Sequence, residues 1–136
     1  MDVVALIARI AFASIFIGAG FGHLTATAAM AGYAQSKKLP QPTLAVQVSG
    51  VYILVASALL VLGVWPDLAA IALVPFLLIT AVVFHDFWRL ESPEERQLEQ
   101  IQFSKDLSLA GGALALFALY ASDGHPGLTL VDPLFG

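Results

Sequence analysis

The chain has 136 residues, of which 59% are hydrophobic and only 12% are charged, and it contains no cysteine. Soluble domains carry about 25% charged residues, so this composition excludes an ordinary water-soluble domain and predicts a membrane protein. A net charge of −4 with only six Lys and Arg residues argues against binding to nucleic acid. Without cysteine the chain has no disulfide, no thiolate metal ligand and no cysteine nucleophile.

The first three apolar segments predict three helices, each close to the length of about 20 residues that a bilayer requires. The first covers about residues 3–23 and is interrupted only by Arg9. The second covers about 44–64 and contains no charge, and a tight turn connects it to the third, about 68–87. A cleaved signal peptide is disfavoured for the first segment, because no positive charge precedes it and it exceeds the usual apolar core of a signal.

The fourth helix is predicted to begin in the polar segment after the third. Ser92 can cap a helix, Pro93 suits its first position, and Glu95 completes a capping box. We therefore expect one continuous helix over about 93–121, whose first part lies in or beyond the lipid headgroups. The segment between the first and second helices, 24–43, is expected to be a loop.

The four helices predict a single all-α domain over residues 1–136, an integral membrane four-helix bundle. Its orientation follows from the basic residues, because cytoplasmic loops of membrane proteins are enriched in Lys and Arg. Five basic residues lie in the two longer connections and at their borders, namely Lys37, Lys38, Arg89, Arg96 and Lys105. The opposite side has no Lys or Arg outside the membrane, so both termini are predicted to be extracytoplasmic.

Six polar residues from all four helices are predicted to lie at one depth, at the cytoplasmic end of the bundle. They are His23, Gln47, His85, Asp86, Lys105 and Asp106. Ionisable groups at membrane depth are costly, and they usually face the bundle interior and pair with one another. The layer therefore predicts a polar ligand-binding pocket at the cytoplasmic mouth. The alternative is purely structural, since charged side chains at helix ends can reach the headgroups.

Arg9 is the deepest full charge, about two turns from the extracytoplasmic end of its helix. An unpaired guanidinium is costly at that depth, so its candidate partners are backbone carbonyls, Asp67 or an anionic ligand. No metal site is expected in the polar layer, because no two of its four histidine and aspartate side chains stand three or four residues apart on one helix. The adjacent His85 and Asp86 would also point about 100° apart.

Small residues spaced four apart let helix backbones approach closely, and Gly18 and Gly22 have this spacing in the first helix. Gly111 and Ala115 repeat it in the fourth. The glycine-rich run at 18–22 is not a phosphate loop, because it lacks a preceding strand and the Lys-Ser/Thr ending. We therefore expect these glycines to serve close packing.

Together these residues resemble the DoxX family. The resemblance covers about residues 3–121, and its most specific parts are Phe84-His85-Asp86-Phe87-Trp88 and the segment from Lys105 to Gly112. The matching positions are Arg9, Gly22, His23, Gly50, His85, Lys105, Gly111 and Gly112. Members are small four-helix bacterial membrane proteins, which implies a multi-pass protein of the bacterial plasma (inner) membrane. Gln47 departs from the family, because relatives often carry Glu there and a neutral amide cannot accept a proton.

The resemblance implies a membrane subunit or anchor of a redox or sulfur-stress complex, with protein partners or a homo-oligomer. A quinone or small anion would bind in a pocket formed by Arg9, His23, Gln47, Asp86, Lys105 and Asp106. His85 would be the catalytic residue and exchange protons with a quinone carbonyl, since its reference pKa lies near neutral. Electrons would come from a partner. Two alternatives stay open: a small-molecule or lipid transporter, and a non-catalytic bundle that docks partners through residues 93–102.

Overall fold

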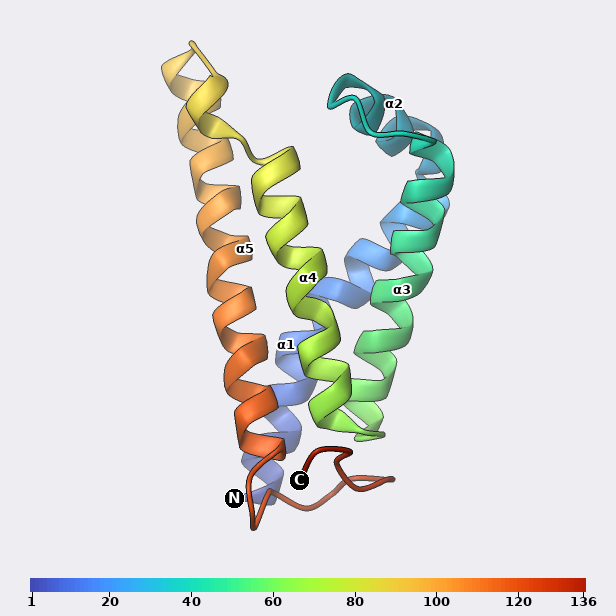
Figure 1. Ribbon diagram of the computed structural model, residues 1–136, viewed down its shortest axis with the longest axis vertical. Coiled ribbons are helices and arrows are strands. Elements are labelled where there is room, and N and C mark those ends of the chain that lie inside the picture. Colours follow the sequence, from blue (N-terminus) through green and yellow to red (C-terminus); the bar gives the residue numbers. More distant parts are fainter.

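The computed structural model describes all 136 residues, and every regular element in it is helical (Figure 1). The four long helices are α1 (Asp2–Thr25), α3 (Pro42–Leu62), α4 (Pro66–Phe84) and α5 (Pro93–Tyr120). Two short elements connect them, α2 (Thr27–Ser36) and the 3-10 turn η1 (Phe87–Arg89). The expected all-α fold is confirmed. Both termini lie at the same end of the molecule, opposite α2 and the start of α5 (Figure 1).

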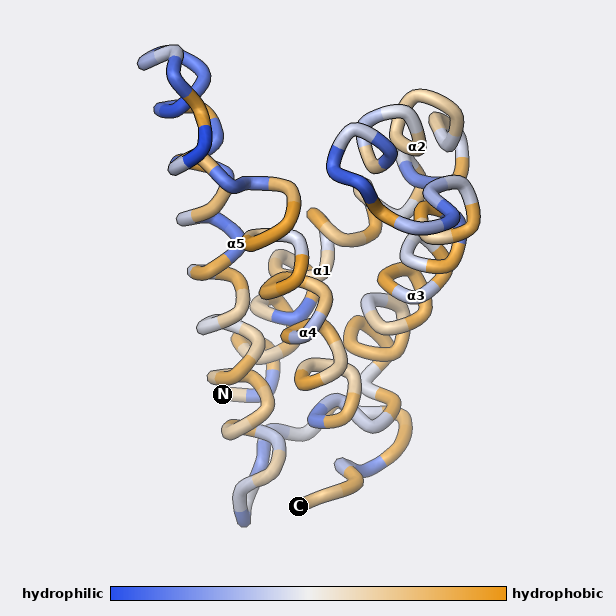
Figure 2. The backbone as a smooth tube through the Cα atoms, turned by 45° about the horizontal axis from the view of Figure 1, so that its top comes forward, coloured by the Kyte–Doolittle hydropathy of each residue, from blue (hydrophilic) through white to orange (hydrophobic).

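Three segments are long and apolar enough to cross a membrane, namely α1, α3 and the segment Pro66–Arg89 that begins with α4. The helix α5 differs, because its first half is hydrophilic and its second half is apolar (Figure 2). Large apolar side chains such as Val48, Val55, Ile79 and Leu114 are exposed on the outside of the helices. A surface of this kind is suited to lipid rather than to water.

The core lies between the long helices, where α1 packs against α3 and α5 packs against α4. Side chains from all four meet there, among them Phe16, Ile53, Leu60, Leu73, Leu77 and Tyr120. In lipid, close packing of this kind stabilises helix association, because burial from water no longer drives it.

The segment between α1 and α3 differs from the expectation of a loop, because residues 27–36 form α2. Four of its ten residues are Ala, the strongest helix former. Ala31 and Ala34 pack against Val46 of α3, so the helix lies over the end of the bundle. A search for bilayer-length apolar segments misses a helix this short. The helix α4 also ends at Phe84, three residues earlier than expected.

The backbones of α1 and α3 approach each other at Gly20 and Gly50. A Cβ added to Gly20 would lie 3.1 Å from the Gly50 carbonyl oxygen, and one on Gly50 would lie 2.7 Å from His23 Cβ. At Gly18, Gly22 and Gly111 an added Cβ would meet nothing within 4 Å. The expectation that these three glycines bring helices together is therefore wrong, and in α1 the neighbouring Gly20 does so instead.

Candidate functional site

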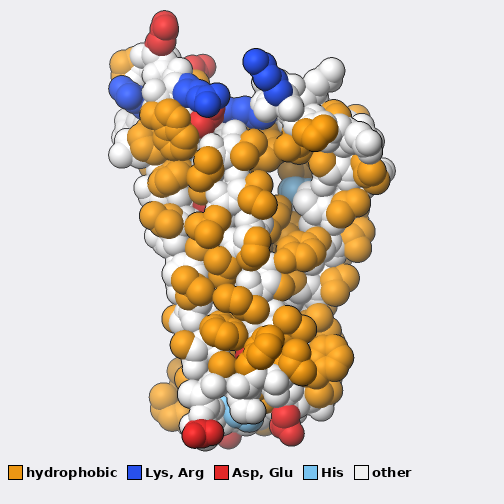
Figure 3. Space-filling model, viewed as in Figure 1, with side chains coloured by type: hydrophobic (Ala, Val, Ile, Leu, Met, Phe, Trp, Pro, Cys, Tyr) orange, Lys and Arg blue, Asp and Glu red, His pale blue; other side chains and the backbone are white.

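The two ends of the molecule carry different charges. One end, here called the basic end, consists of residues 27–41 and 85–106, which include α2, η1 and the start of α5, and it holds five of the six Lys and Arg residues. The other, here called the terminal end, consists of residues 1–2, 63–67 and 121–136, and its charged residues are acidic. Figure 3 shows blue side chains at the first end and red ones at both. The sixth basic residue, Arg9, is buried near the terminal end.

A cavity of about 500 Å³ lies near the basic end, between α2 and the four long helices. Figure 3 shows the surface hollowed in this region. The walls are mostly apolar and include Phe16, Phe76, Leu77 and Leu109. Polar groups are contributed by Tyr33, His23, Ser49, Thr80, His85, Lys105 and Asp106. Binding sites for small molecules commonly have this size and this combination of apolar walls with a few polar groups.

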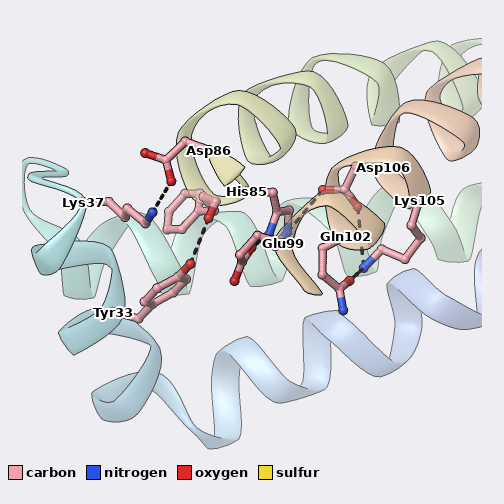
Figure 4. A network of polar contacts seen from close by, with 9 residues as sticks. Tyr33, Lys37, His85, Asp86, Glu99, Gln102, Lys105 and Asp106 are labelled. Carbon is pink, nitrogen blue, oxygen red and sulfur yellow. Dashed lines mark hydrogen bonds and ion pairs between the residues drawn. The ribbon is translucent and has the colours of Figure 1, made fainter. Parts of the chain in front are cut away.

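His85 stands between two carboxyl groups of α5 (Figure 4). Its Nδ1 lies 2.6 Å from Glu99 Oε2, and its Nε2 lies 3.6 Å from Asp106 Oδ2. Glu99 and Asp106 are seven residues apart, so two helical turns place them on the same face. The exposed fraction of the side chain is 29% for Glu99 and 6% for Asp106. The three groups therefore lead from the surface to the cavity wall.

Asp106 carries a buried oxygen, Oδ2, that has no hydrogen-bond partner. Its other oxygen lies 3.7 Å from Lys105 Nζ, which donates a hydrogen bond of 2.5 Å to Gln102. Buried polar atoms in proteins are nearly always hydrogen-bonded, and an unpaired one is costly. Because this oxygen belongs to a residue that lines the cavity, a bound ligand that donates a hydrogen bond would satisfy it.

His23 lies on another wall of the cavity, where α1 meets α3. Its Nδ1 lies 2.8 Å from Ser49 Oγ and 3.2 Å from the Val46 carbonyl oxygen. The close approach of Gly20 and Gly50 brings His23 Cβ next to the α3 backbone, and so it fixes where the imidazole stands. The cavity is therefore flanked by two histidines that different helices position.

The short helix α2 is tied to the end of α4 at the rim of the cavity. Tyr33 donates a hydrogen bond of 2.9 Å to the Phe84 carbonyl oxygen, and Lys37 forms an ion pair with Asp86 (Figure 4). Partial burial, followed by the charge of Glu99, raises the pKa of the Tyr33 phenol. The phenol therefore stays protonated at neutral pH and keeps its role as a donor.

The structure brings some of the predicted site residues together and leaves others apart. His23, His85, Lys105 and Asp106 line the cavity. Asp86 instead pairs with Lys37 and lines an adjacent cleft of about 590 Å³. Two other residues do not reach the cavity, Gln47, which is exposed on α3, and Arg9, which lies near the terminal end.

Sequence reasoning missed four polar residues of this site, Tyr33, Ser49, Thr80 and Glu99. The position of Glu99, seven residues before Asp106, indicates that both share one face of α5, so helical periodicity could have identified it. The sequence does not indicate that Tyr33 and Ser49 reach the cavity. Tyr33 is positioned by α2, and Ser49 is positioned by the packing of α1 against α3.

At the terminal end, the hydrogen-bond partners of the buried charges are backbone groups, which serve both oxygens of Asp67 but only one nitrogen of Arg9. Arg9 Nη2 donates a hydrogen bond of 2.6 Å to the Leu128 carbonyl oxygen. The carboxylate of Asp67 accepts hydrogen bonds from the backbone amides of Leu68, Leu134 and Phe135, at 2.8, 2.9 and 2.6 Å. Of the partners expected for Arg9, the structure therefore contains a carbonyl and not Asp67.

The fold and the cavity together define an all-helical integral membrane protein with a polar, ligand-sized cavity near one end. The chain belongs to the DoxX family, whose model matches residues 4–86. It is 34% identical over 114 residues to the inner membrane protein YphA of Escherichia coli (strain K12), covering 84% of this chain and 81% of YphA. No solved structure matches the chain. The matched family segment contains His23 and His85 and ends before Lys105 and Asp106.

Proposed function

We propose that this chain crosses the bacterial inner membrane four times and binds a quinone in its cavity, as a membrane subunit of a redox complex. The basic residues support the orientation, because five lie at the basic end and cytoplasmic segments are enriched in them. The terminal end would then face outward. The relative YphA is described as an inner membrane protein, which fits this location. The fourth crossing would be the apolar second half of α5, which packs on α4.

The cavity suits a quinone in both shape and chemistry. Its apolar walls match the ring and hydrocarbon tail, and His23, His85 and Asp106 supply polar groups for the ring oxygens. A bound quinone supplies reversible chemistry of two electrons and two protons. The electrons would come from a protein partner that holds the redox centre, and the protons would come through this chain.

The observation that carries the proposal is the series Glu99, His85 and Asp106. Glu99 is partly exposed at the basic end, and Asp106 is buried in the cavity wall with one oxygen unpaired. An imidazole with a carboxyl group on each side can take a proton at one nitrogen and release one from the other. The series therefore offers a route from the cytoplasmic surface to a ligand that must gain or lose protons.

The proposal is tested by comparing His85→Ala with His125→Ala in the full chain, expressed in its native membrane with its partners. His125 is the matched control, because it lies at the terminal end, far from the cavity along α5. We expect His85→Ala to slow quinone reduction by about 100-fold, the usual contribution of a general acid–base, and His125→Ala to leave the rate unchanged. An unchanged rate in His85→Ala would show that the site assignment is wrong. Solute uptake by proteoliposomes that depends on His85 without quinone reduction would favour a transporter.

A further inference from the structure

The terminal end contains a buried positive charge that is incompletely paired. Arg9 is fully buried, and only its Nη2 has a hydrogen-bond partner; Nε and Nη1 have none. Tyr120 of α5 is also fully buried, and its hydroxyl has no partner. The Arg9 guanidinium carbon lies 5.6 Å from the centre of the Tyr120 ring. Unsatisfied donors of two neighbouring side chains are thus gathered at one place.

No carboxylate lies within ion-pair distance of the Arg9 guanidinium, and the nearby Asp2 acts on Tyr120 only at longer range. The ion pairs of the molecule all lie at the basic end, and none includes Arg9. The nearby Asp67 is occupied by three backbone amides. Buried charges in proteins are usually paired with an opposite charge, because removing an ion from water is costly. The unpaired N–H groups of Arg9 are therefore suited to an anion.

The present contact of Arg9 occupies one N–H group of Nη2, the nitrogen that both modes of oxyanion binding share. A guanidinium binds an oxyanion through two parallel N–H groups, and it offers two such pairs, Nε with Nη2 and Nη1 with Nη2. Nη2 belongs to both pairs because it carries two N–H groups, and the Leu128 carbonyl oxygen accepts from one of them. While this contact exists, only one of the two pairs is free. The carbonyl oxygen stands where an oxygen of an anion would bind.

The Leu128 carbonyl belongs to a C-terminal segment whose later residues are fixed by hydrogen bonds. The backbone amides of Leu130 and Val131 donate to the Gly63 carbonyl oxygen at 2.9 and 3.0 Å. The amides of Leu134 and Phe135 are held by Asp67. Leu128 itself has a φ of 57°, a left-handed conformation that is strained for leucine. The stretch 121–129 is thus a strap across Arg9, attached at both ends and strained where it makes its contact.

We propose that Arg9 and Tyr120 form a binding site for a small oxyanion, either a carboxylate or a tetrahedral sulfur or phosphorus oxyanion. The Leu128 carbonyl occupies one N–H pair of the site when the strap is closed. When the strap lifts, both N–H pairs of Arg9 are free and the Tyr120 hydroxyl can donate to the same anion. The site lies at the opposite end from the quinone cavity, so it stands or falls independently of the proposed function.

The absence of cysteine and the positions of the two tryptophans allow a direct test. Trp65 lies in the turn beside Gly63, and Trp88 lies at the basic end. In the full chain with Trp88→Phe, reconstituted in lipid nanodiscs, Trp65 fluorescence reports on the Arg9 region. Sulfate and acetate are the probes, because they separate tetrahedral from planar oxyanions. We expect one of them to change the fluorescence, and Arg9→Lys to weaken its binding about tenfold, since Lys keeps the charge but lacks the paired donors.

The matched control for Arg9→Lys is Arg89→Lys, an exposed arginine at the basic end, which should bind the probe like the parent. Deleting residues 128–136 removes the competing carbonyl, so the shortened chain should bind about tenfold more tightly. If the shortened chain does not fold, the full chain with a spin label on Asp132→Cys is used instead. The mobility of the label should then rise when the anion is added. The proposal is overturned if Arg9→Lys binds like the parent. It is also overturned if neither anion alters the fluorescence or the label.

Discussion

The two ends of the molecule bury charge in different ways. At the terminal end, Arg9 and Asp67 are paired with backbone carbonyls and amides, which do not titrate. At the basic end, charged side chains pair with one another, and one oxygen of Asp106 remains unpaired beside a cavity. A charged side chain whose partners are backbone groups keeps one protonation state, because those partners do not titrate. A histidine between two carboxyl groups can instead exchange protons with them. The comparison therefore supports the proposed proton chemistry at the basic end, and it assigns the anchoring of the C-terminal segment to the terminal end.

The largest effect on stability is expected for Asp67→Ala, because it removes the acceptor of three backbone amides, two of them from the C-terminal segment. We expect a loss of about 3 kcal/mol in the free energy of unfolding, measured by denaturant titration in detergent micelles. Asp123→Ala, an exposed residue at the same end, is the control and should change stability by less than about 0.5 kcal/mol. Equal effects of the two variants would contradict this role, because Asp67 would then not anchor the C-terminal segment.

The next largest effect is expected for Gly50→Ala, which places a methyl group against His23 Cβ. We expect a loss of about 2 kcal/mol, because overpacking forces the helices apart, together with weaker quinone binding as His23 moves. Gly111→Ala is the matched control, since a Cβ there meets nothing within 4 Å. It should leave the protein as stable or slightly more stable, as alanine favours helix over glycine. If the two variants behave alike, Gly20 and Gly50 do not set the cavity wall.

A kinetic effect is expected for Glu99→Gln, which keeps the shape of the outer group next to His85 but removes its charge. We expect proton uptake coupled to quinone reduction to slow about tenfold, while stability changes by less than about 0.5 kcal/mol. Uptake can be followed with a pH-sensitive dye on the cytoplasmic face of membrane vesicles. Glu94→Gln, on the exposed start of α5, should have no effect. Normal uptake in Glu99→Gln would mean that protons reach the cavity by another path.

The smallest effect is expected for Lys37→Ala, which breaks the ion pair with Asp86. The pair is only partly buried, with 20% and 10% of the two side chains exposed, so its loss should cost about 1 kcal/mol. Hydrogen exchange in α2 should increase, because the pair ties this helix to the end of α4. The neighbouring Lys38→Ala removes an equal charge without that pair, and its hydrogen exchange should match the parent.

How far the sequence could predict this structure depended on the length of each element. The long helices were predictable because a bilayer requires about 20 apolar residues, and the capping box of Ser92 and Glu95 located the start of α5. The helix α2 was not predictable in this way, because its ten residues are too few to form an apolar segment of bilayer length. Its position explains why Lys37 and Tyr33 reach the end of α4.

Within the site, depth was predictable and direction was not. The positions of His23, His85, Lys105 and Asp106 along their helices indicated one layer, and the structure places all four on the cavity wall. Gln47 shares their depth but faces outward, because its helix turns Val46 and Gly50 toward the interior. The rotation of a helix about its own axis depends on packing at residues such as Gly20. No spacing in α3 alone reveals it.

The most direct test of the proposed quinone binding is photolabelling with an azidoquinone, carried out on the full chain in its native membrane and read by mass spectrometry. If a quinone binds in the cavity, we expect labels on cavity residues such as Phe76 and Leu109, and we expect these labels to be lost in Asp106→Asn. Labels confined to lipid-facing residues such as Val55 and Leu114, with no change in Asp106→Asn, would contradict it.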